Sequence, residues 1–189
     1  MNSIFPRSPR TPPSRCQVRP AGTDENLIRR ARGGDLDAFA VLADRHGPMA
    51  YRVALRLLGH PEHAADVAEE AMVTAWRQLP GFPAETSFST WLYRIVVRRA
   101  LNRAFRAQPA PKAERGLTVD PVTAAVAALP PSQRVVMVLH HFEGLPDQEI
   151  ARITGSTGPA VRSHLFRGRC TLATTLRDWS EPPKPVTVT

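Results

Sequence analysis

Apolar residues recur every three or four positions through most of this 189-residue chain, and no stretch alternates apolar with polar residues over the length of a strand. Between residues 36 and 43 the apolar positions include Leu36, Phe39, Ala40, Leu42 and Ala43. That spacing places side chains on one face of an α-helix, whereas a half-buried strand requires alternation. The chain is therefore predicted to be all-α, and its length allows one domain or two small ones.

Glycines and prolines divide this pattern into helices. A first helix is expected from Asp24, whose side chain can cap it, to Arg32, with Gly33-Gly34 ending it. A second helix follows Asp35 and is expected to break at Gly47-Pro48 before it resumes. Two further helices are expected over 62–79 and 89–105, joined by a loop at 80–87.

Composition divides the chain further. The first 22 residues hold five prolines and four arginines and no acidic residue, so they cannot bury enough apolar surface to offset their ordering entropy. Residues 108–116 combine proline, alanine and charge without periodicity, which is typical of a flexible linker. The expected segments are a disordered tail at 1–22, a helical domain at 23–106, a linker at 107–121, a second helical domain at 122–179 and a disordered tail at 180–189.

Charge and composition exclude several classes of protein. The formal net charge is +8, which favours polyanionic partners and nucleic acid first. Two cysteines without metal-ligand spacing exclude a disulfide scaffold and a zinc ribbon, and no apolar run is long enough for a membrane span. Phosphate-binding glycine loops, nucleophile elbows and zinc-protease motifs are also missing from the sequence. We therefore expect no enzymatic activity, no metal and no cofactor.

The most specific local pattern lies at 147–169. A short apolar-periodic helix is followed by a turn at Gly155, a possible cap at Thr157 and a proline at 159, in the first turn of a second helix. This is the pattern of a helix-turn-helix, although a plain helical hairpin with a solvated basic face remains the alternative. The outward positions suit the major groove of DNA, and they are Arg162, Ser163, Phe166, Arg167 and Arg169.

Two charged faces stand out in the first half of the chain. Arg99, Arg103 and Arg106 form one stripe, while Arg94 and Arg98 form another. Arginines beside aromatic residues are typical of single-strand binding, although Trp91 itself is expected to be core.

The other face is acidic and lies on the third helix. Asp66 and Glu70 are four residues apart, where like charges repel, and a basic protein partner would relieve that repulsion; the alternative is complementation of the helix dipole.

Seven motifs, in order and at matching separation, resemble the sigma-70 family of bacterial RNA polymerase sigma factors, in particular the extracytoplasmic-function class (group IV). They are residues 34–39 (GDLDAF), 65–72 (ADVAEEAM), 88–95 (FSTWLYRI), 129–134 (LPPSQR), 142–145 (FEGL), 149–151 (EIA) and 161–169 (VRSHLFRGR). The resemblance covers about Asp24 to Leu176 and implies a sigma-2 domain and a sigma-4 helix-turn-helix domain. It also implies an alternative sigma factor that acts in the cytoplasm with core RNA polymerase, promoter DNA and an anti-sigma factor.

The resemblance assigns roles to named positions. Binding of the coiled coil of the largest polymerase subunit is expected at Asp66, Glu69, Glu70 and Val73. Contacts with minus-ten DNA are expected from Phe82, Glu85, Thr86, Ser87, Phe88, Arg94, Arg98, Arg99, Arg103 and Arg106. Contacts with minus-35 DNA are expected from Thr157, Ala160, Arg162, Ser163, Phe166 and Arg167. The same domain is expected to bind the flap of the second-largest subunit.

The sequence departs from the family pattern at a few positions. Arg98 stands where the family usually has an asparagine that holds an extruded minus-ten base. Glu69 and Met72 replace a glutamine and an aromatic residue, and Pro146 replaces a serine cap. The rival interpretation is a one-component LuxR-like regulator with a helix-turn-helix. It predicts a ligand-binding or phosphoacceptor domain in front, where this chain has an arginine-rich helical region.

Overall fold

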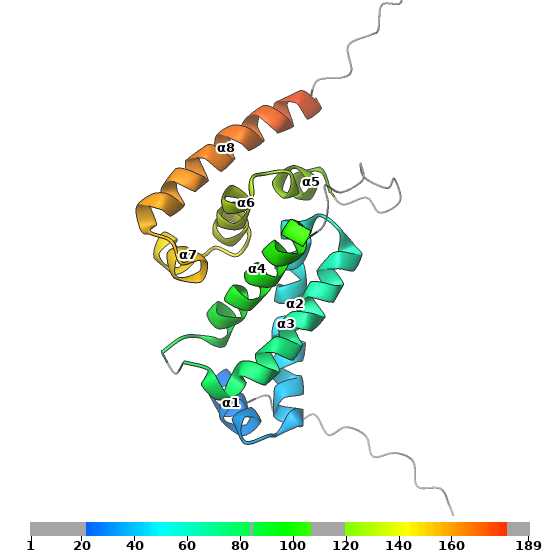
Figure 1. Cartoon of the computed structure of the whole chain (residues 1–189), viewed down its shortest axis with the longest axis vertical. Helices are drawn as coiled ribbons and strands as arrows, with labels where there is room; N and C mark the ends of the chain where they lie inside the picture. The colour runs from blue at the N-terminus through cyan, green and yellow to red at the C-terminus, as the bar shows by residue number, and fades with distance from the viewer. Residues whose placement is uncertain (1–21, 84, 107–119, 181–189) are drawn as a thin grey trace, which may run out of the picture.

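The structure, a computed structural model, describes residues 22–83, 85–106 and 120–180, and these form helices and turns without any strand. The expectations for both tails and for most of the linker lie outside these described residues. Figure 1 shows two groups of helices, one above the other in that view. The first group contains α1 (Asp24–Arg32), α2 (Leu36–Leu58), α3 (Pro61–Gln78), the short 3₁₀ turn η1 (Leu79–Gly81) and α4 (Phe88–Arg106). The second contains α5 (Pro121–Ala127), α6 (Pro131–Met137), the π-helical turn η2 (Val138–Phe142), α7 (Asp147–Thr154) and α8 (Gly158–Ser180).

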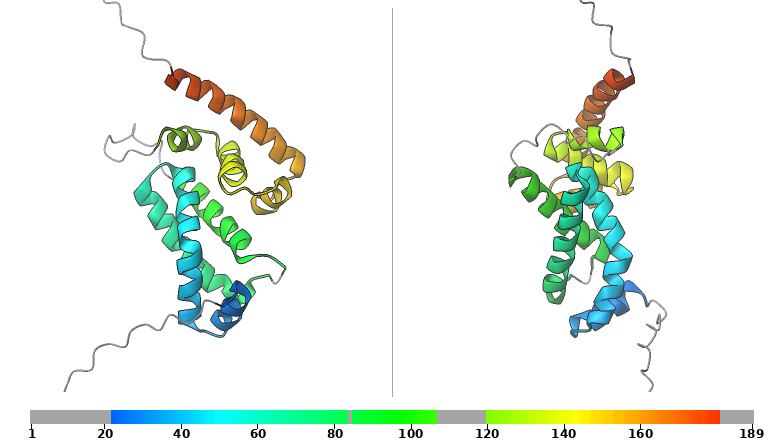
Figure 2. Two further views of the ribbon diagram at one scale, coloured as in Figure 1. Left: turned by 180° about the vertical axis from the view of Figure 1, so that it is seen from behind. Right: turned by 90° about the vertical axis from the view of Figure 1, so that its right-hand side faces the viewer.

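In the first group, three long helices lie side by side and α1 crosses one end of them (Figures 1 and 2). Their contact faces are rich in alanine, and these alanines are at most 1% exposed: Ala50, Ala54, Ala64, Ala71, Ala75 and Ala100. Side chains this small let the helix axes approach closely. Larger residues, among them Leu42, Leu57 and Leu92, fill the remaining space and are likewise almost completely buried. The predicted all-α class is confirmed.

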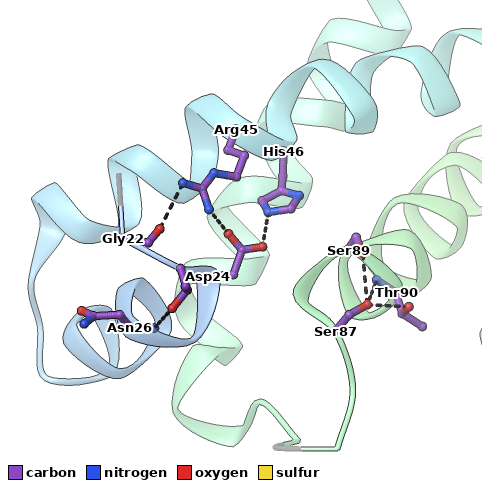
Figure 3. A network of polar contacts seen from close by, with 9 residues as sticks. Gly22, Asp24, Asn26, Arg45, His46, Ser87, Ser89 and Thr90 are labelled. Atoms are coloured by element: carbon purple, nitrogen blue, oxygen red, sulfur yellow. Dashed lines mark hydrogen bonds and ion pairs between the residues drawn. The ribbon is translucent and has the colours of Figure 1, made fainter. Parts of the chain in front are cut away.

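The start of α1 differs from the prediction. Thr23, not Asp24, is the N-cap, and its Oγ1 accepts a hydrogen bond from the Asn26 amide at 3.4 Å. Asp24 is the first residue within the helix, and its carboxylate binds the Arg45 guanidinium and His46 Nε2 on α2 (Figure 3). The prediction failed because either residue can cap a helix, and the tertiary contact with α2 uses the aspartate.

The expected break at Gly47-Pro48 is also wrong, because α2 continues through it as one helix of 23 residues. Proline removes the hydrogen bond to the carbonyl four residues earlier, and its ring crowds that carbonyl. Both Pro48 and Asp44 lie on the exposed side of α2, where water can serve that carbonyl. On the opposite side Leu42, Met49 and Val53 are buried, and they hold the two parts of the helix in one register.

The second group contains the predicted helix-turn-helix, made of α7 and α8. Gly155 ends α7 in the left-handed conformation, with φ of 67°, as expected. Thr157 Oγ1 accepts a hydrogen bond from the Ala160 amide at 3.4 Å and so caps α8. Farther along α8, Gly168 lies against α6, where an added Cβ would be 2.8 Å from Cγ of Met137. Within the described residues, no helix is both long and apolar enough to span a membrane.

The two groups share a polar interface that the sequence did not indicate. Arg134 on α6 donates to the carbonyl of Leu57 on α2 at 2.7 Å, and to the Leu129 carbonyl at 2.9 Å. Burial lowers the pKa of this guanidinium. Tyr93 on α4 donates its hydroxyl proton to Glu143 at 2.9 Å. Burial and this hydrogen bond raise the pKa of Tyr93.

Two further contacts cross that interface. The Arg56 guanidinium lies 4.4 Å from the centre of the Phe142 ring, a cation–π distance. Thr90 on α4 donates a hydrogen bond to Glu149 on α7. The minus-ten helix proposed from the resemblance and the first helix of the helix-turn-helix therefore lie in direct contact.

A tight contact at Gly59 leads to a testable prediction for this interface. Gly59 has φ of 71°, and an added Cβ would lie 2.9 Å from Cβ of Ala127 on α5. We expect Gly59→Ala to destabilise the fold by about 1–2 kcal/mol from backbone strain alone, measured by thermal unfolding. Gly144→Ala is the matched control, since Gly144 has φ of 67° and nothing lies within 4 Å of its added Cβ. Equal unfolding temperatures for both variants would contradict this account.

Candidate nucleic-acid interface

A groove of about 910 Å³ runs between α3 and α4. Four of its lining residues are basic, namely Arg94, Arg98, Arg99 and Arg103. The two stripes predicted from helical spacing therefore meet in a single groove. Trp91 also lines it but is only 8% exposed, which confirms that its ring belongs mainly to the core. Arg106 ends α4, and its side chain lies outside the described part of the chain.

Arg94 is half-buried in this groove. Its Nε is buried, and no hydrogen-bond partner for it is present among the described residues. A buried guanidinium donor without a partner is costly, so a ligand that supplies an acceptor in the groove would be favoured. Arg98 differs, because its side chain is exposed.

The loop before α4 is built on buried aromatic rings. Phe82 and Phe88 were expected at minus-ten DNA, yet they are 6% and 2% exposed. Their ring centres lie 5.2 and 5.7 Å from that of Trp91, so the three rings form a cluster inside the protein. Neither phenylalanine offers a ring face to a base in this structure. The sequence shows only that both residues are aromatic. Such residues can either fill a core or stack on a base, and the sequence does not say which.

The polar residues of the same loop are accessible. Glu85 and Ser87 are exposed and Thr86 is half-buried. Ser87 Oγ accepts a hydrogen bond from the Thr90 amide at 3.2 Å and so caps α4 (Figure 3). Among the expected minus-ten loop residues, these three are therefore the ones that a base can reach, and Ser87 also fixes where the helix begins.

Arg32 holds the other end of that loop, a role that sequence reasoning missed. Its guanidinium donates to the carbonyls of Leu79, at 3.2 Å, and Phe82. It also lies 5.7 Å from the centre of the Phe82 ring. The sequence offered little indication of this role. A basic residue in the last turn of the first helix is already explained by the helix dipole.

The acidic face of α3 lies beside this groove and carries a second hollow of about 560 Å³. All four expected polymerase-binding residues, Asp66, Glu69, Glu70 and Val73, line this hollow. Val73 is 50% exposed and adds an apolar side chain to this surface. The structure thus brings the four predicted residues together on one surface.

Arginines of α4 neutralise part of that acidic face. Arg103 contacts Asp66 at 2.7 Å, and Arg99 contacts both Glu70 and the Thr74 hydroxyl. The like-charge repulsion expected between Asp66 and Glu70 is therefore relieved inside the protein. The expectation that a basic protein partner would relieve this repulsion did not foresee these arginines, because helical spacing on α3 alone does not show what α4 supplies.

The predicted recognition face of α8 points away from the protein core. Phe166 is 69% exposed, and Arg162, Ser163 and Arg167 are exposed as well. Arg167 donates to Ser163 Oγ at 2.8 Å, which orders both side chains along one ridge. The Arg162 guanidinium lies 3.9 Å from the Asp147 carboxylate at the start of α7. Thr157 is exposed and Ala160 half-buried at the beginning of the helix.

Comparisons with known proteins agree with this arrangement. Residues 42–109 match the family model described as Sigma-70 region 2, and residues 120–172 match that described as Sigma-70, region 4. The first match includes both the groove and the acidic face, and the second includes the exposed helix-turn-helix. The comparisons give no support to a LuxR-like regulator.

Individual relatives and a solved structure cover most of the chain. It is 30% identical over 173 residues to the RNA polymerase sigma-H factor of Pseudomonas aeruginosa, covering 77% of this chain and 90% of that relative. It is 31% identical over 163 residues to the ECF RNA polymerase sigma factor SigM of Mycobacterium tuberculosis, covering 80% of this chain and 83% of the relative. The structure of CnrH in complex with the cytosolic domain of CnrY matches with a TM-score of 0.67 and 27% identity, over 84% of this chain and 99% of that one. The chain therefore belongs to the sigma-70 family, as an alternative sigma factor of the extracytoplasmic-function class that directs transcription by RNA polymerase.

Proposed function

We propose that the acidic face of α3 binds core RNA polymerase. The face consists of Asp66, Glu69, Glu70 and Val73, and it would meet a basic coiled coil of the largest subunit. The observation that carries the proposal is that these four residues line one hollow in an otherwise basic protein, together with Arg77 and Arg99, and that Val73 is half exposed there. The carboxylates suit a basic partner, and Val73 gives that partner apolar surface to cover.

The groove between α3 and α4 would hold the single-stranded minus-ten DNA. Its arginines supply charge for phosphates, and the buried donor of Arg94 favours an acceptor from the nucleic acid. Base selection would fall to the accessible loop residues Glu85, Thr86 and Ser87. A carboxylate accepts from the amino group of cytosine or adenine, while the hydroxyls either donate or accept.

The helix-turn-helix would bind the minus-35 element through α8. Its exposed arginines suit guanine edges and phosphates, and the exposed Phe166 suits a thymine methyl group. In this proposal residues 23–106 act at the minus-ten element, 122–179 at the minus-35 element and the polymerase flap, and 107–121 connect them. The polymerase, in the cytoplasm, carries out all covalent chemistry.

An anti-sigma factor is the expected regulator. One structure with the same fold, at 19% identity and a TM-score of 0.62, is a sigma factor of Bartonella quintana bound to its anti-sigma factor. That likeness concerns the fold, so the partner of this chain is proposed from family membership. Such a protein would bind where it excludes the polymerase, either on the acidic face of α3 or across the interface between the two helical groups.

The double variant Glu69→Arg, Val73→Asp tests polymerase binding and, with it, the proposed function. Both side chains are exposed, and no ion pair in the described residues involves Glu69. We expect wild type to co-purify with core polymerase and to support initiation at its promoter, and the variant to do neither at an unchanged unfolding temperature. Wild-type co-purification by the variant would refute the assignment.

The variants Arg162→Ala and Arg167→Ala test how α8 divides its contacts. Arg162 lies near the start of the recognition helix, where base edges are reachable, so its loss should cost about 1–3 kcal/mol and relax sequence preference. Arg167 is held along the ridge by Ser163, where it meets phosphate, so its loss should weaken all sequences equally and lower the salt dependence. Binding of each variant to a library of minus-35 sequences measures both effects. Identical specificity profiles for the two variants would contradict this division of base and phosphate contacts.

The variant Arg98→Asn tests the departure from the family pattern. Guanidinium can only donate hydrogen bonds, so the wild-type protein should prefer a base with acceptors or leave that position nearly unselected. Replacing the loop 85–87 should then change minus-ten preference more than Arg98→Asn does. Open-complex formation on a minus-ten library measures both effects. A larger shift from Arg98→Asn would assign base selection to α4 instead of the loop.

A further inference from the structure

Arg32 extends from a helix that is itself held firmly in place. It is the last residue of α1, and the apolar side of that helix is buried. At the other end of α1, the Asp24 carboxylate contacts His46 Nε2 at 2.8 Å and also binds Arg45, both on α2 (Figure 3). A side chain attached to such a support can hold a neighbouring segment in a defined position.

The segment that Arg32 holds leads into the loop before α4. Its Nε donates to the Leu79 carbonyl at 3.2 Å, and its Nη2 donates to the Phe82 carbonyl. The Leu79 carbonyl also accepts a hydrogen bond from the Phe82 amide at 3.1 Å. Because a guanidinium is planar and its donors have a fixed spacing, two carbonyls bound to it are held in a defined relative orientation.

This constraint passes along the backbone to a residue that is proposed to read a base. The Phe82 carbonyl belongs to the peptide bond with Pro83, so fixing that carbonyl fixes the whole peptide plane. The proline ring restricts φ of Pro83, which leaves ψ as the one free backbone torsion before the next carbonyl. The Pro83 carbonyl in turn accepts a hydrogen bond from the Thr86 amide at 3.3 Å. Thr86 is therefore connected to Arg32 through two hydrogen bonds and a proline.

The other end of the loop is fixed by α4. Ser87 Oγ accepts a hydrogen bond from the Thr90 amide at 3.2 Å. Glu85 and Thr86 thus lie between two fixed points, the Pro83 carbonyl on one side and the Ser87 cap on the other. Hydrogen bonds to a base edge depend on distance and angle, so the placement of these two side chains decides which base they accept.

We infer that Arg32 is a positioning residue for minus-ten recognition, which orients Glu85 and Thr86 through the Phe82 carbonyl without contacting a base. The inference rests on the proposed function of this loop. The arginines that line the groove assigned to DNA lie on α4, whereas Arg32 ends α1. Loss of Arg32 should therefore reduce discrimination among bases. A phosphate contact would have a different signature, because phosphates carry no sequence information.

The variant Arg32→Gln tests this role in the full-length chain assembled with core polymerase. Affinity is measured by fluorescence anisotropy for labelled single-stranded minus-ten oligonucleotides, each with one base varied. At the position that the loop reads, the ratio of affinities for the best and the worst base should fall by about tenfold, the equivalent of one hydrogen bond to a charged group. Affinity for the worst base should stay near that of wild type. Unchanged discrimination, or an equal loss of affinity for every base, would overturn the inference.

Two further variants separate positioning from charge and from stability. Arg30→Gln removes the same charge from the same helix and breaks an ion pair with Asp35 at 2.7 Å, yet it should keep wild-type discrimination. Arg32→Lys keeps the charge but lacks the planar fork, so it should lose discrimination in the same direction as Arg32→Gln. An equal loss in Arg30→Gln would attribute the effect to a loosened α1, and wild-type discrimination in Arg32→Lys would attribute it to charge; either result would overturn the inference.

A double-mutant cycle shows whether Arg32 acts through the loop. Glu85→Ala with Thr86→Ala removes the two side chains that Arg32 is inferred to orient. Adding Arg32→Gln to this variant should change base preference no further, because interacting residues are not additive. A further loss of preference would show that Arg32 acts elsewhere and would refute its role as a positioning residue.

Failure of the inference is distinguishable from failure of the proposed function. If Glu85→Ala with Thr86→Ala keeps the wild-type base preference, the loop does not read the base, and both the assignment of the loop and the role of Arg32 fail. If that variant loses the preference while Arg32→Gln keeps it, the loop retains its function and only positioning by Arg32 is excluded.

Discussion

The close approach of α2, α3 and α4 is the constraint on which the rest of this structure depends. Alanines at most 1% exposed line the contact, and larger side chains in their place would separate the helix axes. At this separation Arg99 and Arg103 reach across from α4 to the carboxylates of α3. The spacing of the two charged helices therefore depends on small residues that lie in the core.

The sequence predicted those features that depend on local spacing. The helix-turn-helix was predictable because Gly155, Thr157 and the proline at 159 each have a conformational role that depends on chain position alone. The arginine stripes were predictable for the same reason, since helical periodicity puts them on adjoining faces. All-α class and the position of α4 followed from the same patterns.

The features that could not be predicted depend on contacts between distant segments. Helical spacing shows that Asp66 and Glu70 share a face, but not that arginines 29 and 37 residues later neutralise it. An aromatic residue in a loop can stack on a base or fill a core, and only the folded environment decides, as Phe82 and Phe88 show. Pro48 signals a break that burial on the other side of α2 prevents.

The predicted recognition helix α8 packs very closely on α6 at one glycine. An added Cβ at Gly168 would lie 2.8 Å from Met137, which is itself 4% exposed and has little room to move aside. Arg162 lies six residues before this point, about 9 Å along the helix axis. A larger residue at this glycine would push α8 away from α6. The shift would move the exposed arginines of α8 relative to the major groove of DNA. The register of promoter recognition is thus set partly by an interior position that never meets DNA.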